Sequence, residues 1–112
     1  MSGMSADSIH SIRLEKWPGA QPPSEQEAEA RLRQEGYDSY RWYDVPGASY
    51  PKHQHYHDEC IWVLTGEISF SIHGTDYSLK AGDRIYLPAR TTHTATIPAK
   101  AGVTYLVGEK RN

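Results

Sequence analysis

The chain has 112 residues, which is enough for one domain with a single hydrophobic core. Its formal charge of -2, with both signs interspersed, argues against a nucleic-acid-binding protein, which would carry a basic patch or stripe. No apolar stretch approaches the roughly 20 residues needed to cross a bilayer, and residues 1–10 show no secretory signal. A single cysteine, Cys60, excludes an internal disulfide framework, so we expect a cytoplasmic protein.

The N-terminal third of the chain predicts an arm followed by a short helix. Residues 1–23 are polar and irregular, and residues 24–36 have a helical pattern. Ser24 and Glu27 have the spacing of a capping box, and Gly36 supplies the stop. The apolar stripe of this helix is thin, so we expect it to lie on a surface; it consists of Ala28 and Leu32. Three apolar residues of the arm can form one edge strand, namely Ile9, Ile12 and Leu14.

Residues 37–112 have the pattern of many short strands. Residues 60–64 form a continuous apolar run, which is typical of a buried strand, and residues 68–72 alternate as a half-buried strand does. Residues 73–76 predict a hairpin turn, residues 103–107 predict the last strand, and residues 108–112 predict a polar tail. Closely spaced short strands indicate an all-β sandwich or barrel. Two of the six histidines, His10 and His73, are expected at the surface.

A cluster of histidines carries the strongest chemical signal. Imidazole and carboxylate are the ligands that borderline and hard divalent metals prefer. Residues two apart on a strand point the same way, about 6.6 Å apart, so His53 and His55 can share a face, and Glu59 has the same parity. His93 must come from a separate strand that faces the same interior. These four residues therefore predict one metal site.

Two alternatives remain open from the residues alone. The segment can be a solvated surface loop that happens to contain histidines. His57 has the parity of His55, so a shift of register would make it a ligand in place of His53; otherwise we expect it at the mouth of the site.

These residues resemble the conserved motifs of the cupin family. The first motif fits without gaps and consists of Gly47, His53, His55, Glu59 and Gly66. The second motif is matched by Gly82, Pro88 and His93. Arg90 stands at its second glycine, which weakens the prediction of a glycine-type turn, and Ile97 stands at its asparagine. The two motifs span residues 47–97.

The resemblance implies an all-β double-stranded β-helix, or jelly-roll barrel, at residues 37–112. It implies that His53, His55, Glu59 and His93 bind one divalent ion, which the donor set leaves open among iron, manganese, nickel, cobalt, copper and zinc. It also implies a homodimer. Dioxygenases, isomerases, lyases and non-catalytic binders all occur among cupins, so the fold alone does not fix a reaction.

The residues add a prediction about the ligand. Three neutral imidazoles, one carboxylate and a divalent cation carry a net charge of about +1, which favours a small molecule with a carboxylate or a hydroxy-carbonyl group. Candidates for a separate acid or base are few, and they are Tyr86, Tyr105 and His57. We therefore expect a metal-dependent oxygenase, isomerase or lyase, or alternatively a non-catalytic binder or sensor.

An aromatic-rich segment precedes the histidines. It contains Tyr37, Tyr40, Trp42, Tyr43 and Tyr50. Tyrosine and tryptophan are enriched in the cores of interfaces, so we expect a dimer interface here in preference to a platform for an aromatic or sugar ligand.

Overall fold

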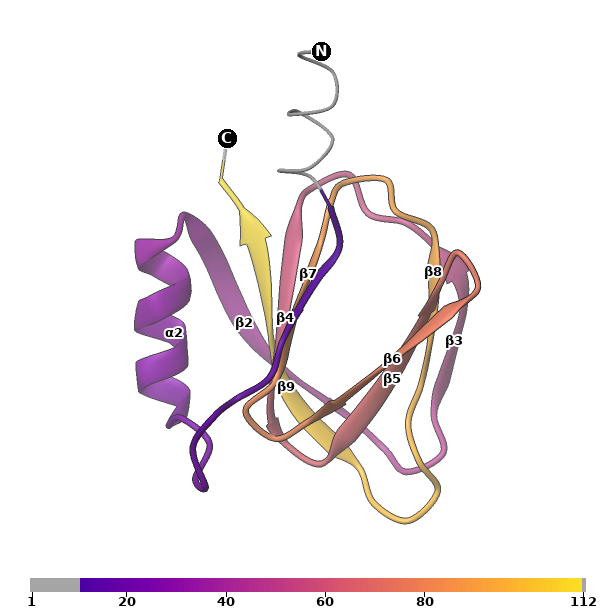
Figure 1. The fold of residues 1–112 in the computed structure, drawn as a ribbon, viewed down its shortest axis with the longest axis horizontal. Coiled ribbons are helices and arrows are strands. Elements are labelled where there is room, and N and C mark those ends of the chain that lie inside the picture. The colour runs from indigo at the N-terminus through magenta and orange to yellow at the C-terminus, as the bar shows by residue number, and fades with distance from the viewer. Residues whose placement is uncertain (1–10, 112) are drawn as a thin grey trace.

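The computed structural model describes residues 11–111, and there two antiparallel sheets face each other (Figure 1). The five-stranded sheet has the order β1-β7-β4-β9-β2, with bounds Arg13–Glu15, Arg84–Leu87, Glu59–Thr65, Val103–Lys110 and Tyr37–Asp44. The four-stranded sheet has the order β3-β8-β5-β6, with bounds Ser49–His53, His93–Thr96, Glu67–Ile72 and Thr75–Lys80. This is the predicted all-β jelly-roll architecture.

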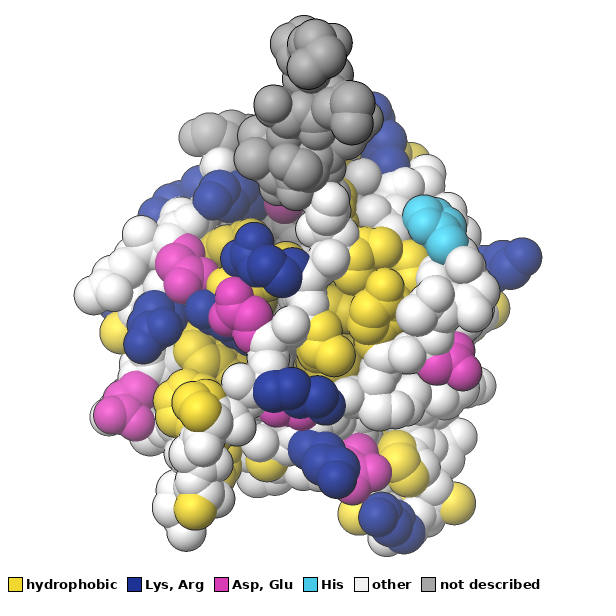
Figure 2. Space-filling view, viewed as in Figure 1, with side chains coloured by type: hydrophobic (Ala, Val, Ile, Leu, Met, Phe, Trp, Pro, Cys, Tyr) yellow, Lys and Arg dark blue, Asp and Glu magenta, His cyan; other side chains and the backbone are white. Residues whose placement is uncertain are grey.

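The main core lies between the two sheets. Alternate residues of each strand point inward, so Ile61 and Val63 of β4 meet Ile68, Phe70 and Ile72 of β5 in one buried cluster. Some of this apolar material is visible at the surface beside the N-terminal strand, where hydrophobic side chains gather in the middle of the face in Figure 2. Partly buried residues at the margin of the cluster include Ile12, Leu14 and Tyr77.

The single helix of the described residues, α2 (Glu25–Gln34), covers the outer face of the five-stranded sheet. Ser24 and Glu27 form the predicted capping box, with both reciprocal hydrogen bonds present. The helix buries only Ala28 and Leu32, which pack in a second cluster with Cys60 and other residues of the sheet. Its position on a surface is as predicted.

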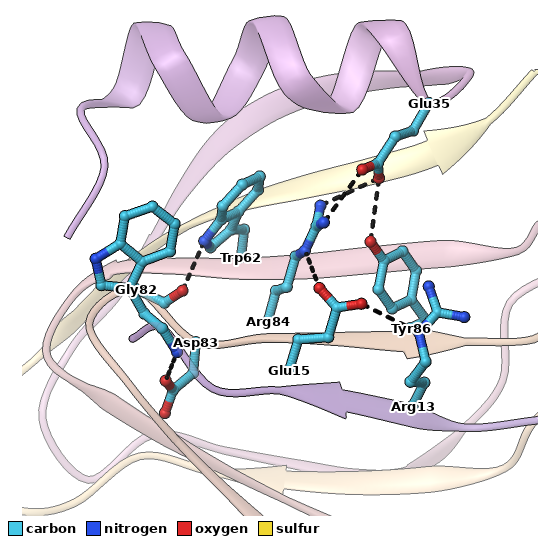
Figure 3. Close-up of polar contacts among 9 residues, drawn as sticks. Arg13, Glu15, Glu35, Trp62, Gly82, Asp83, Arg84 and Tyr86 are labelled. Atoms are coloured by element: carbon cyan, nitrogen blue, oxygen red, sulfur yellow. Dashed lines mark hydrogen bonds and ion pairs between the residues drawn. The ribbon is translucent and has the colours of Figure 1, made fainter. Parts of the chain in front are cut away.

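An Arg84-centred network fixes the N-terminal strand and the helix to the sheet (Figure 3). The buried guanidinium group of Arg84 donates two hydrogen bonds of 3.1 Å to Glu35, at the helix C-terminus, and one of 3.1 Å to Glu15 of β1. It also lies 4.3 Å from the ring centroid of Trp62. Bidentate, charge-assisted pairs fix the orientation of the groups that they join. Arg84 of β7 therefore holds β1 and the end of α2 in place on the outer face of the five-stranded sheet.

The structure differs from the sequence-based expectation in the last strand and the hairpin. β9 continues to Lys110, so most of the segment expected as a polar tail belongs to a strand. The turn between β5 and β6 consists of His73 and Gly74 alone, both with positive φ, because a two-residue hairpin of this twist requires that conformation. His73 is exposed as predicted. Ile9 and His10 lie outside the described residues; the edge strand itself is present as β1.

No helix among residues 11–111 is both long and apolar enough to cross a membrane.

We predict that Asp83→Asn destabilises the fold by about 1–3 kcal/mol at neutral pH, since it removes charge-assisted hydrogen bonds of a buried group. The carboxylate accepts from the backbone N–H groups of Trp17 and Lys80 and from Lys16 Nζ. Burial acts to raise the pKa of Asp83, but these hydrogen bonds outweigh it and lower the pKa below 3.8. The stabilisation is therefore present above pH 3.8 and is lost as the pH falls further.

Urea unfolding of both proteins between pH 7 and pH 3 measures this effect. Asp76→Asn, which makes the same charge change at an exposed position of β6, is the control. Equal stabilities of the Asp83 and Asp76 variants at pH 7 would contradict the prediction.

Candidate metal centre

Three histidines meet where β3 pairs with β8. His53, the last residue of β3, lies directly opposite His93, the first residue of β8, and their ring centroids are 4.3 Å apart. His55 follows in the loop after β3, and its ring centroid is 4.9 Å from that of His53. One ligand atom from each of the three side chains lies within 4.8 Å of the other two. The structure thus brings together three of the four residues predicted from the sequence.

A bulge in β3 accompanies this alignment. Between the pairs Tyr50–Ala95 and His53–His93, β3 advances by three residues and β8 by two. The extra residue lies in the Pro51–Lys52 segment, and a bulge is one of the few places where a sheet accepts proline. The sequence-based expectation of one regular strand through His55 is therefore wrong: the strand is bulged and ends at His53.

Backbone carbonyl groups orient two of the imidazoles. His53 Nδ1 lies 2.8 Å from the carbonyl oxygen of Pro51, and His93 Nδ1 lies 2.8 Å from that of Thr91. A carbonyl can only accept, so Nδ1 donates in both rings and Nε2 keeps its lone pair in the neutral form. This is the arrangement in which a metal-binding histidine is held by its other nitrogen.

Two loops that carry site residues are tied to each other. The backbone N–H of Arg90 donates to the carbonyl oxygen of His55 at 2.6 Å, and that of Ala89 donates to Asp58 at 2.7 Å. Arg90 has a φ of +63°. The left-handed turn typical of glycine is thus present although arginine stands there, and it aims the Arg90 N–H at the His55 loop.

Glu59, the fourth predicted ligand, lies beside the histidines but outside the group of mutually close ligand atoms. Its side chain is buried, and its Oε2 is 3.4 Å from Nδ1 of His55. Burial, followed by repulsion from Glu109, raises the pKa of Glu59 to about 7. Glu109 lies directly opposite Glu59 in the pairing of β4 with β9. A cation between these groups and the histidines would relieve the repulsion.

The surroundings of His55 and His93 favour the neutral imidazole, which is the form that binds metals. Burial lowers the pKa of His55, and the neighbouring His53 and His57 lower it further. Burial also lowers the pKa of His93, more than its hydrogen bond to Thr91 raises it. Because the pKa of Glu59 is raised while that of His55 is lowered, both shifts disfavour an ion pair between them. The donor set therefore fits a divalent ion: neutral imidazoles and a carboxylate in need of a positive partner.

A cavity of about 200 Å³ gives access to these groups. Its apolar walls include Ile61, Phe70 and Leu87, and its polar groups are the three histidines, Glu59 and Glu109. A larger hollow of about 480 Å³ lies on the other face of the sheet, around Arg84. Four charged groups of this hollow pair with one another to hold β1 and α2 (Figure 3), namely Arg13, Glu15, Glu35 and Arg84. Glu59 lines both spaces, but the three histidines line only the smaller cavity, which is therefore the candidate functional site.

The other candidates from the sequence are distributed differently. His57 is exposed and is not part of the three-histidine group. Tyr86 lies on the outer face of the sheet, where its hydroxyl donates to Glu35. Tyr105 lines the cavity, but its hydroxyl donates to Asp44 at 2.6 Å. Cys60 is buried under the helix, as expected of a small hydrophobe, and burial raises its pKa to about 12.

Sequence reasoning did not assign three residues to the cavity lining, namely Tyr40, Trp42 and Glu109. It also did not find Asp44, which accepts a hydrogen bond from Trp42. Glu109 has the parity of Tyr105 and Val107, both of which lie in the predicted last strand, so a strand two residues longer would have placed it on their face. It was overlooked because the strand was expected to end at residue 107. The aromatic pair was noticed but was expected at an interface.

Comparison with known proteins agrees with this architecture. Residues 40–108, more than half of the chain, match the family model described as the cupin domain. The chain belongs to the cupin family. No curated protein matches it significantly in sequence.

Solved cupin structures share its fold. It resembles an RmlC-like cupin from Shewanella frigidimarina, at 23% identity and TM-score 0.60, over 69% of this chain and 68% of that one. It also resembles the polyketide cyclase RemF from Streptomyces resistomycificus, at 21% identity and TM-score 0.60, over 66% and 54%. A structure titled for the DMSP lyases RdDddP and RnDddQII matches at 24% identity and TM-score 0.59, over 67% and 38%. At these identities the likeness shows the fold alone.

We predict that affinity for a divalent ion such as Co²⁺ rises as the pH increases through 7 and levels off only above the pKa of Glu59. Protonated imidazole cannot ligate, and Glu59, with its pKa of about 7, must lose its proton to bind. Both effects weaken binding as the pH falls through 7 and below. Isothermal titration at half-unit steps from pH 5.5 to 8.5 measures this, and a flat profile would count against these ligands.

The same titration tests the named histidine. His93→Ala should lower the affinity by at least about a hundredfold. His73→Ala, an exposed histidine on the β5–β6 turn, should leave it unchanged. Equal losses in both variants would contradict the assignment.

Proposed function

We propose that the protein is a metal-dependent enzyme that acts on a small oxygenated molecule. The observation that carries the proposal is the convergence of three histidines in the wall of an open cavity. A closed structural metal site would leave no room for a substrate, whereas this group borders about 200 Å³ of space. Two of the similar structures are named as a cyclase and as lyases, so enzymes occur on the same fold.

His53, His55, His93 and Glu59 would hold the ion, whose identity the donor set leaves open among iron, manganese, nickel, cobalt, copper and zinc. A bound divalent ion supplies a Lewis acid that polarises an oxygen ligand. The protein contributes the orientation of the imidazoles through Pro51 and Thr91. It also contributes apolar walls, which would limit the access of water to the polarised oxygen ligand.

The charges of the cavity narrow the substrate class. The four ligands and a divalent ion sum to about +1 by their protonation states. Glu109 adds a negative charge across from Glu59, so the loaded cavity is close to neutral. A singly charged carboxylate or a neutral hydroxy-carbonyl compound suits such a site better than a dianion does. Glu109 is also the one acidic group of the cavity lining that is not assigned as a ligand, and we propose it as the proton acceptor for a bound substrate.

We predict oxygen uptake or product formation by the metal-loaded protein with at least one member of a panel of small carboxylates and hydroxy-ketones. Activity should be lost in His93→Ala and retained in His73→Ala. Product analysis by NMR with oxygen-electrode measurements covers oxygenase, isomerase and lyase reactions. Tight binding of panel members without turnover would contradict an enzyme and favour the alternative of a binder or sensor.

We predict that Glu109→Gln tightens the binding of simple carboxylates to the metal-loaded protein by about three- to tenfold, because it removes a nearby like charge. Glu67→Gln, on β5 beside Lys100, is the control and should have no effect. Acetate affinities measured by calorimetry at pH 7.5 decide this. Weaker acetate binding in Glu109→Gln would mean that Glu109 helps to hold the ion or the ligand, and would contradict the charge argument.

A further inference from the structure

Two aromatic rings stand exposed at the wall of the cavity. Tyr40 and Trp42 of β2 are each 48% exposed, and both line the same cavity as the three histidines. They pair with Val107 and Tyr105, whose side chains belong to the interior cluster, so they are on the inward face of their strand. Their ring centroids are 6.4 Å apart in an edge-to-face arrangement. Large aromatic surface left open inside a cavity is characteristic of a ligand-binding wall.

A buried carboxylate fixes this wall. Asp44 accepts hydrogen bonds from Trp42 Nε1 at 3.0 Å, from Tyr105 Oη at 2.6 Å and from the Tyr50 hydroxyl. Trp42 Nε1 also approaches the Tyr50 hydroxyl at 3.3 Å. The donors come from β2, β9 and β3, so one anion joins strands of both sheets. Rings held in place before binding lose little freedom when a ligand arrives.

The wall adjoins the candidate metal centre and the space between them is small. The ring centroids of Tyr50 and His53 are 6.1 Å apart. The cavity holds about 200 Å³, somewhat more than the roughly 150 Å³ of an engineered cavity that accepts benzene. There is room for one ring and one small polar group, and a ligand spanning the cavity would place these against different walls.

We propose that the site selects a ligand with one planar, unsaturated ring that carries a carboxylate or chelating oxygen group. The ring packs against Trp42 and Tyr40, and the oxygen group reaches the histidines. Asp44 is a positioning residue that holds the rings in place. This inference rests on the proposed function for the oxygen group, but the ring wall can be tested separately from it.

Three monocarboxylates with the same charge separate the contribution of the carboxylate group from those of apolar bulk and of a flat aromatic ring. Acetate reports the polar end, cyclohexanecarboxylate adds apolar bulk, and benzoate adds a flat π-surface. With Co²⁺-loaded protein we expect benzoate to bind at least tenfold more tightly than acetate and at least threefold more tightly than cyclohexanecarboxylate, by calorimetry. Trp42→Leu should abolish the preference for benzoate over cyclohexanecarboxylate and leave the acetate affinity and metal content unchanged.

Tyr43→Leu is the matched control, since Tyr43 is exposed on the other face of the same strand. Asp44→Asn should reduce the benzoate preference several-fold without changing acetate affinity, a selectivity that loss of stability would not alter. Should Trp42→Leu fail to fold, Tyr40→Leu serves in its place with the same expectation. Equal benzoate and acetate affinities in the parent, or equal effects of Trp42→Leu and Tyr43→Leu, would overturn the proposal.

Two further outcomes are decisive. If the protein takes up no metal, the proposed function fails, and the wall is then tested with phenol against cyclohexanol on metal-free protein. Phenol binding that Trp42→Leu weakens would support the wall, and its absence would overturn it. If sedimentation shows that Trp42→Leu dissociates a dimer while benzoate affinity stays the same, the wall is an interface between copies and the proposal is wrong.

Discussion

The site depends on one cross-strand pair. His53 and His93 lie opposite each other in the pairing of β3 with β8, and every other group is placed relative to them. Strand side chains alternate between faces, so a slip of one residue would turn one of the two imidazoles away from the interior. The bulge around Pro51 and the carbonyl groups of Pro51 and Thr91 act on this same pair. Local backbone geometry thus determines both the register and the direction of the free ring nitrogens.

The two faces of the five-stranded sheet are used for different purposes. On the outer face, Arg84 satisfies its charge with Glu35 and Glu15, and the helix covers the remaining apolar surface. On the inner face, Glu59 and Glu109 stand side by side without a basic side chain between them in the cavity lining. On the outer face the acidic groups pair with Arg84, which holds the elements together. On the inner face the two carboxyl groups have no lysine or arginine partner in the cavity lining, and a cation would bind there. Burial, followed by repulsion from Glu109, raises the pKa of Glu59 there.

Much of this arrangement could be predicted from the sequence, because it rests on short-range patterns. The capping box at Ser24, the alternation in β5 and the parity of His53 and His55 each follow from local spacing. The residues also predicted His93 as a partner from a separate strand, and the resemblance to cupins supported that assignment. Features created by pairing between distant strands could not be predicted. The bulge in β3, the left-handed Arg90 and the extension of β9 to Lys110 all depend on which strand lies opposite. Glu109 and the Asp44 hydrogen bonds became visible only with that pairing.

In the site proposed here, three imidazoles of one chain bind a single cation. X-ray absorption spectroscopy of the untagged protein, at the edge of the metal found by elemental analysis, tests it most directly. We expect one metal ion per chain, with three imidazole nitrogens and at least one oxygen among its ligands. A metal content far below one per chain after incubation with divalent salts, or a spectrum with fewer than three imidazoles, would contradict it.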